Sequence, residues 1–418
     1  MIETPPAFTR AIDSPFGYPD NQPPTNFLFQ DIDTTMDSCQ SLIGARFYSS
    51  PKPATIAGVF LLVAASLLVP PGSANAAEKV HVYNWNDYIA DDTIENFQRS
   101  SGIEVSYDVY DSNDVLEAKL LPGHSGYDLV FPTARPTAER HIAAGLYQPL
   151  DKSRLSNYHN LDPQILQSLL DVDPGNRYLV PYMWGTTGIG INVAKVQAIL
   201  GDDQPLDSWN LLFDPKIAAK LASCGIAMID DPIDVFGSVW AFLGKDTADV
   251  STAAMEEATA VVAKVRPYVR YFHSSQYIND LANGDICIAQ GYSGDILQAR
   301  DRAEEADNGV TIVYLVPTEG AVMWTDVMAI PVDAPNPSAA LTFINFLLLP
   351  EVIAGITDYV AYANANSAST PLVDEAIRLD PGIYPPPATR HKLFAMPTPS
   401  ERQLREMNRL WTRIKTGM

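Results

Sequence analysis

The chain has 418 residues, of which 46% are hydrophobic and 10% aromatic, and 50 acidic against 28 basic residues give it a formal net charge of −22. This length predicts two lobes rather than one small domain, and the composition supplies enough apolar surface for a substantial core. The negative charge argues against a nucleic-acid backbone or an anionic membrane surface as partner. It favours cationic ligands, although an acidic surface can equally serve solubility alone.

The N-terminal part of the chain predicts an export signal. Residues 56–69 form an uninterrupted run of small and apolar residues, with basic residues before it and helix-breaking residues after it, and the small–x–small sequence 74–76 follows. We therefore expect residues 1–76 to be a leader that is removed by cleavage before Ala77. The run is shorter than the roughly 20 apolar residues of a transmembrane span, so release into a periplasm is the expected outcome. Residues 1–45 lie upstream of the signal and show no periodicity, and they are left out of the fold prediction.

After the leader, the pattern alternates between strands and helices. Apolar or alternating segments predict strands at 80–84, 103–110 and 128–131, and amphipathic segments predict helices at 91–101, 114–121 and 136–144. This order is the βαβ signature of an α/β lobe with a parallel sheet.

The middle of the chain predicts a second lobe. Segments 179–184 and 188–192 are interpreted as a strand that crosses into it, and 310–317 as the return. Between them we expect strands at 225–229 and 286–291 and a helix at 253–265, and after them a strand at 323–331 and helices at 338–348, 350–356 and 400–414.

The predicted fold class is therefore α/β, with two lobes joined by two crossing strands and a ligand cleft between the lobes. The expected boundaries are 77–183 plus 314–385 for a discontinuous first lobe and 184–313 for the second. Residues 386–418 are expected to form a C-terminal segment that packs on the lobes.

The chain has three cysteines, Cys39, Cys224 and Cys287. Cys39 leaves with the leader, so the mature chain keeps an even number in an oxidising compartment. This favours a disulfide between Cys224 and Cys287, with two buried free thiols as the alternative. The sequence has no C-x-x-C pair or His/Cys cluster, and we expect neither a metal site nor a cofactor.

A search for catalytic motifs gives little. There is no G-x-S-x-G, H-E-x-x-H or Walker A sequence, and Gly188-Ile189-Gly190 is only a fragment of a dinucleotide-binding fingerprint. His273 and Ser274 could suggest a base and a nucleophile, but neighbours on a chain rarely face each other, and a polar loop is the better interpretation. The chain is therefore not expected to be an enzyme.

Aromatic residues beside carboxylates recur where strands are predicted to meet the cleft. The pairs are Trp85 with Asp87 and Tyr88, Tyr292 with Asp295, and Trp324 with Asp326, with Asp234 and Tyr362 in further polar stretches. One such pair is typical of a core ring and a helix cap, but three at predicted strand ends point to a shared cleft.

Carboxylates and flat rings together suit a linear polyamine. Such a ligand is an apolar methylene chain with an ammonium at each end, and each ammonium needs a counter-charge when it leaves water. Aromatic rings can cover the methylenes and attract the cations, by roughly 0.5–2 kcal/mol per well-placed contact. An anion binder would instead need arginines or helix N-termini in the cleft.

From about Glu78 to its C-terminus, the chain resembles the periplasmic putrescine/spermidine-binding proteins of polyamine ABC importers. The matching stretches are YNWNDY at 83–88, YDVYDSN at 107–113, PYMWGTTGIG at 181–190, YFHSSQYINDLANGDIC at 271–287 and YANAN at 362–366. The resemblance implies the type II periplasmic binding protein fold, with two lobes that close on the ligand. It also implies a Cys224–Cys287 disulfide and, as partners, a polyamine ligand and a membrane permease with its ATPase, the protein itself acting as a monomer.

Carried over position by position, the resemblance implies a complete ligand site. The aromatic box would consist of Trp85, Tyr292, Trp324 and Tyr362, with Tyr88 beside it. The carboxylates that bind the ammonium groups would be Asp87, Asp234, Asp295 and Asp326. The polar supports would be Asn86, Thr133 and Ser274. Asp234 stands where putrescine-type members have a longer Glu. Trp324 favours acceptance of spermidine as well as putrescine.

Two other functions stay open at this stage. A receptor for betaine or choline would use an aromatic cage with fewer carboxylates. A periplasmic hydrolase or lyase acting on a nitrogenous metabolite would need a nucleophile and a base that the motifs do not supply. A sensor that reports polyamine levels cannot be separated from a transport receptor by sequence.

Overall fold

The computed structural model describes residues 78–417. The predicted leader, its cleavage site and Cys39 lie outside these residues. The described residues all belong to one compact unit.

The N-terminal half of this unit is built as the alternating pattern predicts. Parallel strands β1 (Lys79–Trp85), β2 (Glu104–Tyr110) and β3 (Leu129–Val130) alternate with helices α1 (Thr93–Ser101) and α2 (Asn113–Leu120). Ser112 begins α2, because its side chain accepts a hydrogen bond from the backbone N–H of Val115. The stretch predicted as helical at 136–144 is confirmed, as a turn of π-helix, Ala134–Ala138, followed by α3 (Glu139–Ala143).

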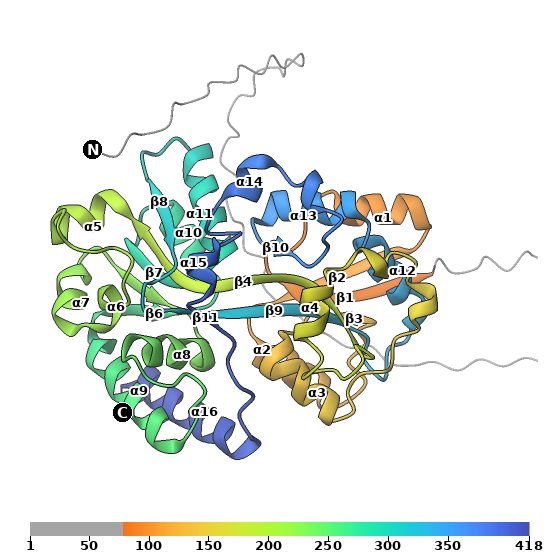
Figure 1. The fold of residues 1–418 in the computed structure, drawn as a ribbon, viewed down its shortest axis with the longest axis horizontal. Helices are drawn as coiled ribbons and strands as arrows, with labels where there is room; N and C mark the ends of the chain where they lie inside the picture. Colours follow the sequence, from red (N-terminus) through yellow and green to blue (C-terminus); the bar gives the residue numbers. More distant parts are fainter. Residues whose placement is uncertain (1–77, 418) are drawn as a thin grey trace, which may run out of the picture. The chain divides into compact units, whose positions relative to one another are not determined.

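Two long antiparallel strands connect the halves of the molecule (Figure 1). The segments 179–184 and 188–192 form one continuous strand, β4 (Leu179–Asn192), which is buried along nearly its whole length. Its partner is β9 (Ala321–Ala329). The prediction that the chain returns through 310–317 is wrong: that segment forms the short β8 (Ile312–Leu315), which pairs only with the far end of β4, and β9 makes the return.

All the strands belong to one mixed sheet. The order is β2-β1-β3-β9-β4-β7-β5-β6, with β8 and β10 (Ala363–Asn364) paired to β4 and β11 (Leu393–Phe394) paired to β9. In the second half, β5 (Ile226–Met228) runs parallel to β6 (Val269–Phe272) and β7 (Ile288–Tyr292). Sequence reasoning missed β6.

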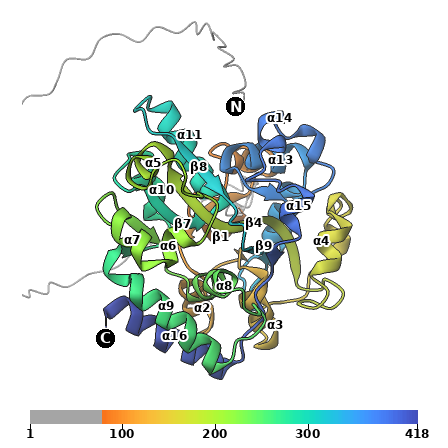
Figure 2. The same ribbon diagram turned by 60° about the vertical axis from the view of Figure 1, so that its left-hand side comes forward.

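Helices cover this sheet in both halves (Figures 1 and 2). The remaining ones are α4 (Pro163–Ser168), α5 (Val193–Leu200), α6 (Asn210–Phe213), α7 (Pro215–Leu221), α8 (Pro232–Phe242), α9 (Thr252–Val265), α10 (Gln276–Ala282), α11 (Ser293–Glu305), α12 (Pro337–Leu347), α13 (Pro350–Val360), α14 (Glu375–Leu379), α15 (Pro387–Arg390) and α16 (Glu401–Thr416). Of these, α9, α12, α13 and α16 were predicted.

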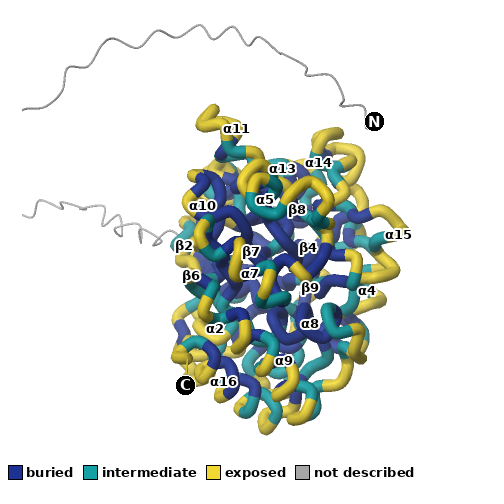
Figure 3. Tube along the Cα trace, turned by 90° about the vertical axis from the view of Figure 1, so that its left-hand side faces the viewer, coloured by how far each residue is buried: buried dark blue, intermediate teal, exposed yellow. Residues whose placement is uncertain are grey.

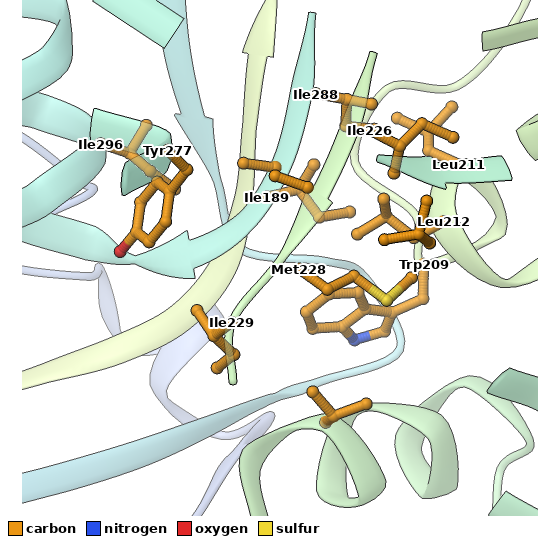
Figure 4. Packing of buried hydrophobic residues seen from close by; sticks show 14 of the residues in the cluster. Ile189, Trp209, Leu211, Leu212, Ile226, Met228, Ile229, Tyr277, Ile288 and Ile296 are labelled. Atoms are coloured by element: carbon orange, nitrogen blue, oxygen red, sulfur yellow. The ribbon is translucent and has the colours of Figure 1, made fainter. Parts of the chain in front are cut away.

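The buried side chains form separate cores. The largest packs Ile189, Trp209, Met228 and their neighbours from the second half of the sheet, and Figure 4 shows this packing around β5 and β7. Two others, which include Phe131 and Leu179, gather around β1, β3 and the near end of β4. The tube in Figure 3 shows β4, β7 and β9 as buried. Separate cores are consistent with a molecule of two lobes. The lobe boundaries expected from the sequence stay a prediction.

The C-terminal helix α16 belongs to the larger core. Ser400 and Gln403 begin it with a reciprocal capping box. Its buried residues Met407, Leu410, Trp411 and Ile414 follow the three- and four-residue spacing of one helix face. This face packs against α9 and brings the end of the chain close to α8.

Among the described residues, no single helix is long and apolar enough to cross a membrane. Only α12 and α13 taken together reach that length and composition, and they are bent by 77° to each other.

Cys224 and Cys287 form a disulfide, as predicted. The bond links the segment before β5 to the segment before β7, across a sequence separation of 63 residues. It therefore ties neighbouring strands of the second half together.

We expect reduction of this disulfide to lower the free energy of unfolding by about 4 kcal/mol, because the bond restricts the unfolded chain. Urea unfolding with and without reductant measures the effect. A Cys224→Ala, Cys287→Ala double variant is the control, and reductant should not change its midpoint. An equal midpoint for the wild-type protein in both conditions would contradict the expectation.

Candidate functional site

A cavity of about 520 Å³ opens where the N-terminal half, the second half and α16 meet. Its lining comes from the ends of β1 and β7, the middle of β9, the first turns of α8 and α11, and the side of α16 that carries Leu404, Asn408, Trp411 and Lys415. Eleven of the twelve predicted ligand-binding residues line it: Trp85, Asn86, Tyr88, Thr133, Asp234, Ser274, Tyr292, Asp295, Trp324, Asp326 and Tyr362.

Asp87 is the predicted residue that the structure does not bring to this cavity. Its backbone is left-handed, with φ of 51°, and its carboxylate accepts a hydrogen bond from Arg302 Nη2 at 3.0 Å. Arg302 lies on α11, so the ion pair joins the loop after β1 to the second half of the molecule. Direct contact of Asp87 with a ligand stays a prediction that this arrangement does not support.

The aromatic residues of the cavity form a continuous edge-to-face series. Tyr292 and Trp324 have ring centroids 5.7 Å apart, Trp324 and Tyr362 5.4 Å, and Tyr362 and Tyr88 5.1 Å. Trp85 stands apart from this series and is held by a hydrogen bond from its indole N–H to the carbonyl of Phe131, at 2.7 Å. The rings supply an apolar wall that is fixed before any ligand binds.

Two glycines allow these rings to lie so close to the backbone. A Cβ at Gly294 would come within 2.5 Å of the Tyr362 ring, and one at Gly185 within 2.7 Å of the Trp324 ring. Gly294 is the second residue of α11, directly before Asp295, so the absence of its side chain lets Tyr362 reach the start of that helix. The Tyr-Ser-Gly-Asp sequence at 292–295 thus serves ring packing as well as placing a carboxylate.

Three buried carboxylates converge on the cavity from three elements. Asp234 lies in the first turn of α8, Asp295 in the first turn of α11 and Asp326 in β9, and each side chain is at most 8% exposed. Positions in the first turn of a helix favour negative charge, because the backbone N–H groups there are positive.

Neutral hydroxyl groups hold these carboxylates in place. Asp295 accepts hydrogen bonds from Tyr277 at 2.7 Å and from Tyr362 at 2.6 Å. Asp326 accepts one from Tyr88 at 2.9 Å, while its Oδ1 atom is buried without a partner among the described residues. Thr187 donates to Asp234.

Within residues 78–417, none of these three carboxylates forms an ion pair with Lys, Arg or His. Burial without a counter-charge disfavours the ionised form. Burial raises the pKa of Asp234 to about 8, with the nearby charge of Asp231 as the second cause. It also raises the pKa of Asp326 to about 7, although the hydroxyls of Thr133 and Tyr88 lower it, and that of Asp295 to about 6, although the hydroxyls of Tyr362 and Tyr277 lower it.

Sequence reasoning missed Asp231, which also lines the cavity. Its side chain accepts hydrogen bonds from the backbone N–H groups of Ile233 and Asp234 and so begins α8. Burial raises the pKa of Asp231 to about 6. The signal was present, because Asp followed by Pro is a typical helix start, and it would have placed Asp234 in a first turn.

The His273-Ser274 pair has the polar-loop role that the sequence favoured. His273 Nδ1 accepts the backbone N–H groups of Ser275 and Gln276, each at 3.1 Å. Ser274 Oγ accepts the backbone N–H of Asp230 at 3.2 Å. These bonds fix the loop before α10, and they leave no base-to-nucleophile contact between the two side chains.

The chemistry of the cavity follows from these contacts. It offers buried carboxyl groups at separate points along an aromatic wall, which can ionise to meet a cation and have no ion pair with cations in the described part of the chain. Such a site suits a flexible, multiply charged cation with an apolar body.

We expect the ligand-free protein to lose stability as pH rises from 5.5 to 8.5. The folded-state pKa values of these carboxyl groups lie above the unfolded value of 3.8, so their stabilising contribution is fully present below that value and is lost progressively as pH rises from it through the folded values of about 6 to 8. The melting temperature should fall by about 5 °C or more over this interval.

An Asp234→Asn, Asp326→Asn double variant is the control for this expectation. It removes the two carboxyl groups with the highest pKa values in the cavity, so its melting temperature should change less with pH than that of the wild type. Calorimetry at several pH values decides the matter, and identical slopes for both proteins would refute the assignment.

Comparison with known proteins agrees with this fold. The family model for bacterial extracellular solute-binding proteins matches residues 92–383. The chain is 50% identical over 361 residues to the putrescine-binding periplasmic protein PotF of Escherichia coli, covering 85% of this chain and 97% of that protein. It is 52% identical over 348 residues to the putrescine-binding periplasmic protein SpuD of Pseudomonas aeruginosa, with 83% and 95% covered.

A solved structure shows the same architecture. The spermidine/putrescine ABC transporter substrate-binding protein PotD of Streptococcus pneumoniae superposes with a TM-score of 0.65 at 26% identity, covering 81% of this chain and 99% of that one. Its fold is that of type II periplasmic binding proteins, as the sequence predicted for this chain. The chain belongs to the family of bacterial extracellular solute-binding proteins.

Proposed function

We propose that this protein captures linear polyamines, putrescine or spermidine, for an ABC importer. The observation that carries the proposal is the set of buried carboxylates, Asp234, Asp295 and Asp326, on one cavity walled by aromatic rings. Each ammonium of a bound polyamine would meet a carboxylate that has no cationic partner among the described residues. The methylenes would lie against the rings.

The relatives support the same ligand class. PotF and SpuD are named as putrescine-binding periplasmic proteins, and PotD as a spermidine/putrescine-binding component. The chain spans nearly the whole length of these relatives, so the comparison concerns the complete binding unit.

The cellular role follows from this ligand and this fold. The protein would be exported by the signal in residues 1–76, cleaved before Ala77, and act in the periplasm as a monomer without catalysing a reaction. It would close around the polyamine and present it to a membrane permease that an ATPase drives. A ligand favours closure only if it binds the closed state better, and a molecule that contacts both Asp326 of β9 and Asp295 of α11 would meet this requirement.

Isothermal titration with putrescine, spermidine and choline tests the proposal. Both polyamines should bind, and choline should bind far more weakly because it carries one charge for several carboxylates. Failure of both polyamines to bind at millimolar concentration would overturn the polyamine assignment, and choline binding as tight as that of putrescine would favour an aromatic cage for quaternary amines.

The Asp295→Asn variant tests the site itself. Loss of one partner of a buried charge pair costs about 2 kcal/mol or more, so putrescine affinity should fall roughly thirtyfold or more. Glu305→Gln is the matched control, since it removes one acidic charge from the exposed end of the same helix. Equal affinities of the two variants would show that Asp295 does not bind the ligand.

A further inference from the structure

One end of the cavity already holds an ammonium group that belongs to the chain. Lys415, near the end of α16, donates hydrogen bonds from Nζ to both carboxylate oxygens of Asp230, each at 2.7 Å. The indole N–H of Trp411 donates to the same carboxylate at 2.6 Å, and Lys415 Nζ lies 6.0 Å from the Trp411 ring centroid. All three residues line the cavity that contains the aromatic box.

This arrangement uses the same two recognition elements as the proposed polyamine site. A lysine side chain is itself an alkyl chain that ends in an ammonium, and here it meets a carboxylate and an indole ring. Asp230 is held independently of Lys415, because its backbone N–H donates to Ser274 Oγ at 3.2 Å and its carboxylate accepts the indole N–H of Trp411 at 2.6 Å. The carboxylate would therefore keep its place if the lysine were absent.

Asp230 is joined to the polyamine site by a short stretch of chain. Asp231 follows it directly and begins α8, and Asp234 lies in the first turn of that helix. All three carboxylates line the one cavity. Acidic groups at 230, 231 and 234 therefore follow one another in the lining, and Lys415 of α16 neutralises the first of them.

The other cations that line the cavity have partners away from Asp230. Arg135 pairs with Asp171 at 3.6 Å, and Arg140 pairs with Glu117. Among the cations that line the cavity, Lys415 is thus the one that pairs with the acidic segment 230–234, which also contains the proposed ligand-binding residue Asp234.

We infer that Lys415 sets the upper length of the ligand by occupying an ammonium subsite at Asp230. This inference rests on the proposed polyamine function. A diamine that sits in the aromatic box ends before this subsite. A tetraamine such as spermine would bring a further ammonium toward Asp230 and meet a cation already bound there, so its extra charge gains no counter-charge.

The Lys415→Met variant tests the inference in the full-length protein by titration with putrescine and spermine. The ratio of spermine affinity to putrescine affinity should rise roughly fivefold or more, because one partly exposed ion pair contributes about that factor to binding. Lys415→Gln is a second variant that keeps a hydrogen-bond donor for Asp230 without the charge, and its ratio should also rise. It keeps the test decisive if Lys415→Met does not fold.

Two controls separate a subsite from a general effect of charge. Arg413→Met removes a cation from an exposed position of the same helix and should leave the ratio as in the wild type. Adding Asp230→Asn to Lys415→Met should abolish the gain, because the carboxylate that receives the extra ammonium is then lost.

The results distinguish this inference from the proposed function. An unchanged ratio in both Lys415 variants, an equal rise in Arg413→Met, or a gain that survives Asp230→Asn would each overturn the subsite while putrescine binding by the wild type stands. Absence of putrescine binding by the wild type would remove the proposed function and the subsite together.

Discussion

The rest of this structure depends on the burial of acidic side chains without a cation of the chain beside them. A buried carboxylate costs several kcal/mol unless it is paired, protonated or richly hydrogen-bonded. The cavity uses the last two means, since tyrosine and threonine hydroxyls bond to Asp234, Asp295 and Asp326 and burial raises the pKa values of all three. A multiply charged cation offsets the same cost by pairing with the ionised carboxylates. The free energy of this pairing contributes to ligand affinity.

The fold supplies this arrangement by bringing strand ends and helix starts to one place. The long β4–β9 pair carries Trp324 and Asp326 between the halves of the molecule, and α8 and α11 each begin beside it with an acidic first turn. Close backbone approach at Gly294 lets Tyr362 pack against the start of α11, and at Gly185 it lets Trp324 pack against β4. The rings and carboxylates of this site therefore come from several strands and helices, and the site forms only where those elements meet.

Much of the architecture could be predicted from the sequence because its elements carry a clear period. The strands and helices of the N-terminal half alternate cleanly, and the apolar face of α16 repeats at helical spacing. Helix α8 was missed because nearly every residue from Asp234 to Ala241 is buried, so it shows no alternation between a polar and an apolar face. The return strand was misplaced because β8 and β9 have similar patterns, and only their pairing with β4 distinguishes them.

The candidate site likewise divides into residues that the sequence places correctly and residues that it does not. Residues in regular positions, such as Trp324 and Asp326 two apart on β9, reach the cavity together as their spacing predicts. Asp87 does not, because a left-handed turn residue directs its side chain in a way that no pattern reveals. Lys415 was missed because its partner, Asp230, lies far from it in the sequence, whereas Asp231 was missed although the Asp-Pro helix start that it forms is a local signal.

Proton release on ligand binding tests the central electrostatic claim most directly. Putrescine stays doubly protonated near neutral pH, as alkyl ammonium groups do, so ionised carboxylates must replace protonated ones when it binds. Titrations at pH 7.5 in buffers of different ionisation enthalpy should show that protons leave the protein on binding, and the release should vanish above about pH 9, where the carboxyl groups are already ionised. Binding at pH 7.5 without proton release, or with proton uptake, would contradict the account.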